Sequence, residues 1–102
     1  MADINAQTIY PNDAVWYRIP RVYMNDVLVT DANPPDTFTY EVALASGGPV
    51  VLSGSLSHSA DDIGRWEVMF NAPAAGTYEI RATVSKNSRA GHFLDSFVVT
   101  AF

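Results

Sequence analysis

Residues 64–99 carry the clearest structural signal in the chain and read GRWEVMFNAPAAGTYEIRATVSKNSRAGHFLDSFVV. Apolar and polar residues alternate in segments 65–70 and 77–84, which flank a turn containing Pro73 and Gly76. A third alternating segment, Phe93–Val99, follows a polar loop. Alternation with a period of two is typical of strands with one buried face. The stretch therefore predicts three neighbouring strands at the end of an all-β domain.

The same alternation extends through the rest of the chain. It predicts strands at Thr8–Tyr10, Ala14–Met24, Val27–Thr30, Thr37–Leu44 and Val50–Ser57. Pro20 lacks a backbone N–H, so it implies a bulge, a switch between sheets or an edge position within the second of these strands. About seven strands with frequent turns are typical of a sandwich. We expect a single domain over residues 1–102: an Ig-like, two-sheet antiparallel β-sandwich of about seven strands.

The parity of the strands predicts the core. The inward-facing set is Phe38, Tyr40, Val42, Trp66, Phe70, Tyr78 and Ile80. Tyr78 also lies just after Gly76, at the start of the penultimate strand. That position is typical of a tyrosine corner, in which the hydroxyl bonds to the backbone a few residues upstream.

The composition of the chain excludes several classes of function. The chain has 102 residues, 48% of them hydrophobic, no cysteine and a net charge of −5. Without cysteine there is no disulfide or thiolate site, and the acidic balance argues against nucleic-acid binding. Apolar runs are too short to span a membrane. The N-terminus shows no secretory signal pattern, so we expect synthesis and folding in a cytosol.

No group of residues matches a catalytic or metal-binding motif. His58 and His92 lie in polar segments without a metal-binding motif, and we interpret both as solvated. Four aspartates at loop positions lack the spacing of a calcium loop and are interpreted as turn residues, namely Asp31, Asp36, Asp61 and Asp62. Alternating serines between 53 and 59 lack a nucleophile elbow. We therefore expect no enzymatic activity, no cofactor and no metal.

The N-terminal quarter and the chain ends supply the candidate interface. Its members are Ile4, Ile9, Tyr10, Trp16, Tyr17, Arg18, Tyr23 and Phe102. Tyr, Trp and Arg are enriched at protein interfaces, and residues 1–10 are a possible contact arm. The alternative is that the aromatic strand simply packs between two layers of the fold.

Several motifs together resemble small Ig-like domains of bacterial and bacteriophage proteins. They are the polar start Asn12-Asp13, the Thr30-Asp31 loop, Gly64-Arg65-Trp66, and the Pro73, Gly76 and Tyr78 pattern. The resemblance covers roughly residues 12–100. It departs from the usual pattern in the longer, proline-rich loop at 27–36.

The resemblance implies a non-enzymatic virion protein, most simply a capsid decoration protein. Such a chain binds the major capsid protein or another virion protein in many symmetric copies, after synthesis and assembly in the host cytoplasm. We expect a homo-oligomer or symmetric array, and no nucleic-acid or membrane partner. Two alternatives stay open: a bacterial Ig-like adhesion or accessory module, and a small carbohydrate-binding sandwich with a row of exposed aromatic side chains.

Overall fold

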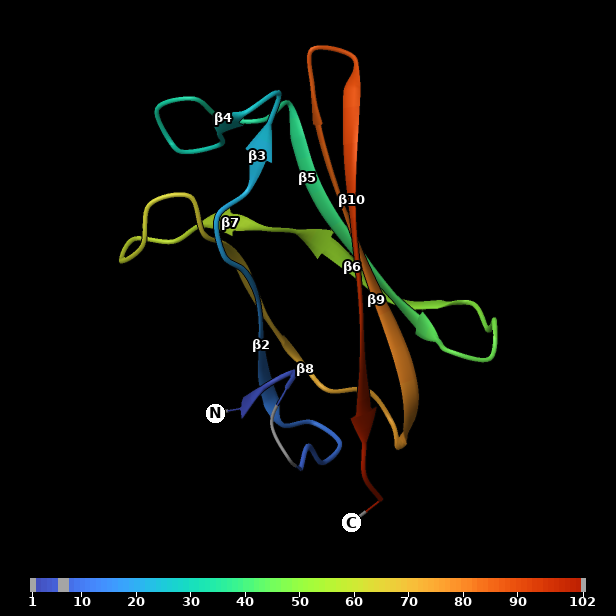
Figure 1. Cartoon of the computed structure of the whole chain (residues 1–102). Coiled ribbons are helices and arrows are strands. Elements are labelled where there is room, and N and C mark those ends of the chain that lie inside the picture. The colour runs from blue at the N-terminus through green and yellow to red at the C-terminus, as the bar shows by residue number, and fades with distance from the viewer. Residues whose placement is uncertain (1, 6–7, 102) are drawn as a thin grey trace.

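The computed structural model describes residues 2–5 and 8–101 and is built from strands (Figure 1). One sheet has the order β1 (Ala2–Asp3), β2 (Ala14–Ile19), β8 (Trp66–Asn71), β7 (Ser57–His58). The other has the order β10 (Arg89–Val99), β9 (Gly76–Lys86), β5 (Thr37–Leu44), β6 (Val50–Ser55). A separate hairpin joins β3 (Tyr23–Met24) to β4 (Val27–Leu28). No helix among the described residues is suited to crossing a membrane.

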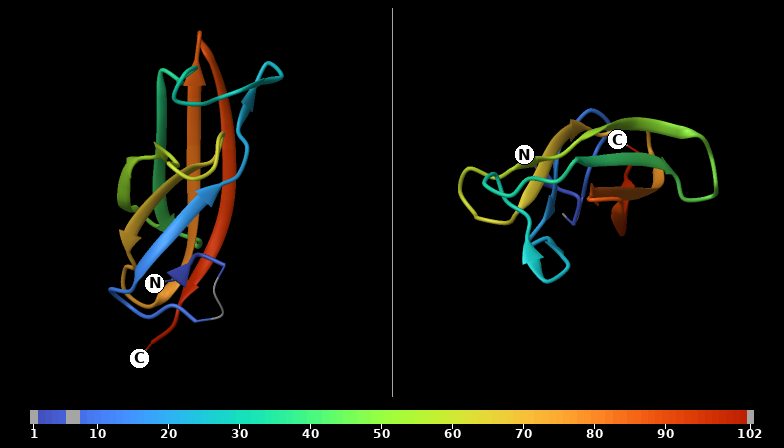
Figure 2. Two further views of the ribbon diagram at one scale, coloured as in Figure 1. Left: turned by 90° about the vertical axis from the view of Figure 1, so that its left-hand side faces the viewer. Right: turned by 90° about the horizontal axis from the view of Figure 1, so that it is seen from above.

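The two four-stranded sheets pack face to face as a sandwich measuring 42 × 29 × 17 Å. Strands β2 and β8 cross the long strands of the other sheet diagonally (Figure 2). This arrangement and the strand order within each sheet are those of an Ig-like sandwich, so the predicted fold class is confirmed. The parallel pairing of β1 with β2 is a local departure from an otherwise antiparallel architecture.

The predicted core is confirmed, because all seven inward-facing residues are buried. Aromatic rings bridge the two sheets. Phe38 on β5 lies 5.3 Å from Trp66 on β8, and Tyr40 stacks 5.9 Å from Phe70, centroid to centroid. Aromatic pairs at such distances add about 0.5–1.5 kcal/mol beyond the burial of their area. These pairs fix how the sheets register against each other.

The tyrosine corner is also present. The hydroxyl of Tyr78 donates a 2.6 Å hydrogen bond to the carbonyl oxygen of Ala74, four residues upstream. The ring of Tyr78 stacks on Phe97 of β10 at 5.5 Å. The turn between β8 and β9 is therefore tied to the strand that it introduces.

Several predicted strands differ from the observed ones. The strand expected at Val50–Ser57 ends at Ser55, and Ser57–His58 pair with β8 in the other sheet. The long strand expected at Ala14–Met24 ends at Ile19, and Arg21 adopts a positive φ of 50° just after Pro20. The chain then leaves its sheet and forms the β3–β4 hairpin, whose turn residues Asn25 and Asp26 also have positive φ. Of the strand expected at Val27–Thr30, only Val27–Leu28 forms.

The last hairpin is longer than its sequence pattern predicts. Strands β9 and β10 have eleven residues each and pair along their whole length. Only Asn87 and Ser88 form the turn, with φ of 52° and 66°, which is the geometry of a type I′ hairpin. The expected polar loop before Phe93 is thus mostly strand, and the hairpin projects beyond the rest of the sandwich (Figure 1).

The N-terminal segment, expected as a possible contact arm, packs against the chain's own core where the structure describes it. Ile4 and Ile9 lie in the core, with 4% and 1% of their surfaces exposed. The backbone N–H of Ile4 donates to the Trp16 carbonyl, and that of Thr100 donates to the Ile9 carbonyl. The segment expected as strand Thr8–Tyr10 is not a strand. It instead lies beside the end of β10 and closes the core.

We expect Tyr78→Phe to lower the free energy of unfolding by about 0.5–1.5 kcal/mol, the net contribution of one intramolecular hydrogen bond. Urea unfolding of both proteins measures the change. Tyr23→Phe is the matched control, because Tyr23 is 55% exposed. Equal stability of Tyr78→Phe and wild type would contradict a structural role for the corner.

We expect Ile9→Ala to destabilise the fold by about 2–5 kcal/mol, because a buried isoleucine is replaced by a cavity. The same substitution at Ile63, which is 68% exposed, is the control and should stay within about 0.5 kcal/mol of wild type. Thermal and urea unfolding measure both. Similar stabilities for the two variants would show that the N-terminal segment is dispensable to the core.

Candidate interaction surfaces

The predicted interface residues do not form one surface. Ile4, Ile9 and Tyr17 are buried within the chain's own core, so their assignment to an interface is corrected. For Tyr17 the reason is its parity on β2, which directs it between the sheets beside Val15 and Ile19. The alternative interpretation, a strand packed between layers, is correct for this face of β2. Phe102 lies outside the described residues.

Trp16 and Arg18 alternate with the buried residues of β2 and lie on the outer face of its sheet. The guanidinium carbon of Arg18 lies 4.6 Å from the centroid of the Trp16 ring. Across the ladder Trp16 pairs with Met69, which is 47% exposed, and Arg18 pairs with Glu67. We call Trp16, Arg18 and Met69 the β2–β8 face. Its backbone is held by the full β2–β8 ladder, so these side chains are presented from a rigid platform.

Trp16 is half-buried, and the two exposed aromatic residues of the described chain lie away from this face. Tyr10 is 37% exposed in the turn before β2, where its backbone N–H donates to Oδ2 of Asp13. Tyr23 is on the β3–β4 hairpin. Because Tyr10, Trp16 and Tyr23 occupy separate elements, they do not form a planar aromatic row.

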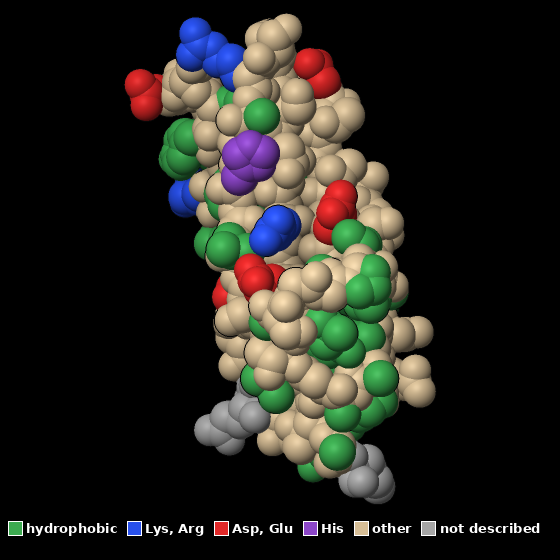
Figure 3. All heavy atoms as spheres, turned by 90° about the vertical axis from the view of Figure 1, so that its right-hand side faces the viewer, with side chains coloured by type: hydrophobic (Ala, Val, Ile, Leu, Met, Phe, Trp, Pro, Cys, Tyr) green, Lys and Arg blue, Asp and Glu red, His purple; other side chains and the backbone are tan. Residues whose placement is uncertain are grey.

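The opposite face of the sandwich carries a shallow polar depression of about 490 Å³. By strand parity its outward side chains come from β5, β9 and β10, namely Thr39, Glu41, Arg81, Thr83, His92 and Leu94. Thr83 Oγ1 lies 3.3 Å from Nδ1 of His92. Figure 3 views this side of the molecule, where charged side chains and a histidine lie in its upper half and hydrophobic side chains gather toward its lower right. The side chains that line the depression include both hydrogen-bond donors and hydrogen-bond acceptors.

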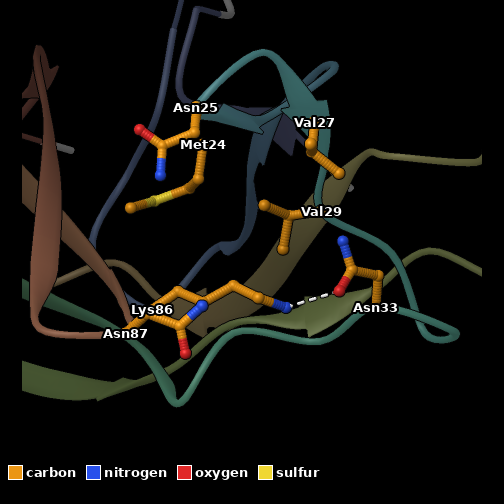
Figure 4. A pocket seen from close by; sticks show the side chains of 7 residues that line it. All are labelled: Met24, Asn25, Val27, Val29, Asn33, Lys86 and Asn87. Atoms are coloured by element: carbon orange, nitrogen blue, oxygen red, sulfur yellow. Dashed lines mark hydrogen bonds between the residues drawn. The ribbon is translucent and has the colours of Figure 1, made fainter.

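A smaller crevice of about 230 Å³ lies where the β3–β4 hairpin meets the end of β9 (Figure 4). Lys86 Nζ donates to Oδ1 of Asn33 at 2.6 Å and to the Pro34 carbonyl at 2.7 Å. Arg89 donates to Oδ1 of Asn25 at 2.6 Å. The basic groups at this end are thus engaged with the loops, and their contacts hold the projecting hairpin against the rest of the chain.

His58 is not the solvated loop residue that its sequence context indicates. Its side chain is only 8% exposed and lies edge-on to Trp66, with ring centroids 5.3 Å apart. Nε2 accepts a 2.8 Å hydrogen bond from the backbone N–H of Gly64. Nδ1 lies 3.3 Å from Oδ2 of Asp31 without the alignment of a hydrogen bond. The exposed His92 does match the expectation.

Two of the aspartates interpreted as turn residues contact other residues, one distant in sequence and one nearby. Oδ2 of Asp36 accepts a bond from the backbone N–H of Asn87, and Asp62 lies 3.8 Å from Arg65. Within residues 2–5 and 8–101, no three His, Cys, Asp or Glu side chains are grouped closely enough to hold a metal ion.

Burial, together with the nearby Asp95 carboxylate, raises the pKa of Tyr17 to about 12. The cause is that a phenolate at this position would lose its hydration and face a negative charge. Burial also raises the pKa of Tyr40. Tyr17 and Asp95 both line a crevice between the edges of β2 and β10, so the two sheets approach each other there through a neutral phenol and a carboxylate.

Comparison with known proteins supports the fold and leaves the activity open. No protein-family model and no curated protein matches the chain. A pullulanase from Bacillus acidopullulyticus has a similar structure over 87% of this chain, with a TM-score of 0.54 and 12% sequence identity. The chain spans only 9% of that protein. The similarity is therefore one of fold, between this sandwich and one β domain of a much larger enzyme.

Between pH 10 and pH 12, we expect Tyr17 alone to lower the free energy of unfolding by about 1.4 kcal/mol for each pH unit. The sign follows because the phenol ionises first in the unfolded chain, where its pKa is near 10.0. Urea unfolding at about pH 9 and about pH 11 measures the loss. Tyr17→Phe should lose less stability over this range than wild type, whereas Tyr23→Phe should behave as wild type. Equal losses in all three would contradict the assignment.

Proposed function

We propose that this chain is a non-enzymatic structural protein that binds the surface of a larger protein assembly, as a capsid decoration protein binds a virion. The observation that carries the proposal is the β2–β8 face, where Trp16, Arg18 and Met69 lie together on a rigid outer surface. The resemblance of residues 12–100 to small Ig-like domains of bacterial and bacteriophage proteins suggests the virion context.

The chemistry of this face suits a protein partner. Trp and Arg dominate the binding energy of protein interfaces, and Met is enriched there. The guanidinium of Arg18 lies over the Trp16 ring, and a side chain whose motion is already restricted loses less entropy on binding. Arg18 places a positive charge on this face of a chain whose net charge is −5. Its guanidinium nitrogens lie 3.8 Å from a carboxylate oxygen of Asp3 and 3.8 Å from one of Glu67.

In this proposal the partner is the major capsid protein or another virion protein, and many symmetric copies bind each particle. A single small face gives only modest affinity for one subunit. Repetition over a symmetric particle, together with contacts between neighbouring copies, raises the overall avidity. The chain then acts in the virion after assembly in the host cytoplasm.

A second candidate function is carbohydrate binding, which two observations favour. The fold is similar to that of a β domain in a pullulanase, a carbohydrate-active enzyme. The depression over β5, β9 and β10 carries hydroxyl, carboxylate, guanidinium and imidazole groups, which suit the hydroxyls of a sugar. The row of exposed aromatic side chains expected for such a module is not found among the described residues, so this candidate ranks second.

We expect the purified chain to co-sediment with capsids that lack it, and Trp16→Ala to weaken this binding by at least about tenfold, the loss typical of an interface hot spot. Met69→Ala should weaken it in the same direction. Leu94→Ala is the control, because Leu94 is 66% exposed on the opposite sheet. Thermal melts of every variant establish that the fold is retained.

Two outcomes would contradict the proposal. Failure of the wild-type chain to bind capsids would overturn the virion role, and equal binding by wild type, Trp16→Ala and Met69→Ala would overturn the role of the β2–β8 face. Affinity electrophoresis in soluble polysaccharides tests the second candidate. Retardation that is lost in Arg81→Ala, but kept in Trp16→Ala, would favour carbohydrate binding instead.

A further inference from the structure

Strand β6 (Val50–Ser55) forms an outer edge of its sheet, since it pairs with β5 on one side only within the described chain. The strand and its flanking segments carry no charge: residues 42–60 contain no Asp, Glu, Lys or Arg, although the chain has seventeen such residues elsewhere. On the neighbouring strand β5, Glu41 lies opposite Ser53. Val50 and Val51 are 50% and 42% exposed. An open, uncharged edge with exposed β-branched residues is a template for pairing with another strand.

The other outer strand of the same sheet, β10, is protected in the ways natural proteins usually use. It carries the charged residues Arg89 and Asp95, and the N-terminal segment bonds to the chain just beyond its end, through Thr100 and Ile9. On β6 the protection is slight. Pro49 precedes the strand, and a bulge leaves Val51 without a partner on β5. Of the two edge strands of this sheet, β6 is therefore the one more accessible to a partner strand.

The ladder shows which backbone groups point outward. The N–H of Leu56 donates to the Phe38 carbonyl, and Leu56 lies directly opposite Phe38 in the register of the β5–β6 ladder. Hydrogen-bonded and non-hydrogen-bonded pairs alternate in an antiparallel ladder. The backbone groups of Gly54 therefore face Tyr40 on β5, whereas those of Ser53 and Ser55 point toward the open edge.

The side chains along this edge suit an identical strand. In an antiparallel pair centred on Ser53, the outward-pointing Ser53 faces its own counterpart, and Leu52 faces Gly54 of the other copy. A Cβ at Gly54 would lie 2.9 Å from Cε1 of Tyr40, so Tyr40 fills the space beside this glycine. The half-buried Leu52 of a second copy would then pack opposite a position without a side chain and beside an aromatic ring.

We propose that β6 pairs with β6 of a second copy of this chain, antiparallel and centred on Ser53, so that two four-stranded sheets become one continuous sheet across a two-fold axis. The lack of charge on β6 permits this occupant. Two chains with a net charge of −5 repel each other, and this edge allows contact without opposing carboxylates. The two-fold axis makes the contact self-complementary.

The inference deepens the proposed function by naming the contact between neighbouring copies, and it uses a surface separate from the β2–β8 face. Its test needs only the isolated protein. Absence of dimers would therefore leave capsid binding by the β2–β8 face intact, and failure to bind capsids would leave the dimer intact. The two proposals can fail independently.

The chain has no cysteine, so a single introduced cysteine reports on the register. In a hydrogen-bonded antiparallel pair the facing Cα atoms are about 5.5 Å apart, within the disulfide range of about 4.4–6.8 Å. We expect Ser53→Cys to form a covalent dimer under mild oxidation at least tenfold faster than Ser55→Cys. Ser55 is the matched control, because in this register the two copies of Ser55 lie about 13 Å apart along the strands.

Sedimentation equilibrium of the cysteine-free protein, from about 1 µM to about 1 mM, measures the association itself. We expect reversible dimers in wild type and at least tenfold weaker association in Ser53→Lys, which opposes two like charges at the axis. Ser96→Lys on β10 should associate as wild type. A wild-type chain that stays monomeric throughout, equal association of the two lysine variants, or equal oxidation rates of the two cysteine variants would each overturn the proposal.

Discussion

The indole of Trp66 is the contact on which the arrangement of the sandwich depends. Its Nε1–H donates a 2.9 Å hydrogen bond to the buried carbonyl of Val29, in the segment that follows the β3–β4 hairpin. Val29 in turn donates to Val22, and Val22 to Gly64, two residues before Trp66 itself. This closed circuit of bonds satisfies backbone groups that burial would otherwise leave unpaired. It holds the connection between the two sheets against the core, where Phe38 and His58 pack on the same ring.

The features that follow from strand parity were predictable from the sequence. On a strand with one buried face a shift of one residue exchanges the faces completely, so the alternation around Val42, Trp66 and Ile80 leaves a single workable register. The corner formed by Tyr78 was predictable for the same reason, because the turn containing Pro73 and Gly76 fixes where its strand begins. The outer position of Trp16 and Arg18 on β2 also follows from alternation.

The features that depend on contacts distant in sequence were not predictable. His58 has no local signal of burial. Its position is set by Gly64 and by Asp31, which belong to different loops. Ile4 and Ile9 occupy a segment without a strand pattern, and they are buried because that segment closes the sandwich beside the end of β10. The hairpin turn at Asn87 was hidden because the polar residues around it continue the strands. Only the positive φ at Asn87 distinguishes the turn from the strands, and asparagine tolerates a positive φ.

The β9–β10 hairpin also bears on how the chain reaches its fold. It is the most extensive pairing in the molecule, and its two-residue turn joins strands adjacent in sequence. Closing such a short loop costs little chain entropy, whereas β2 and β8 must meet across about half of the chain. Local hairpins form on the microsecond timescale, and distant pairings limit the overall folding rate. We therefore expect the hairpin to form first. Strand β5, which pairs with β9, would then add to it, and the sheet that carries β2 and β8 would assemble against this surface.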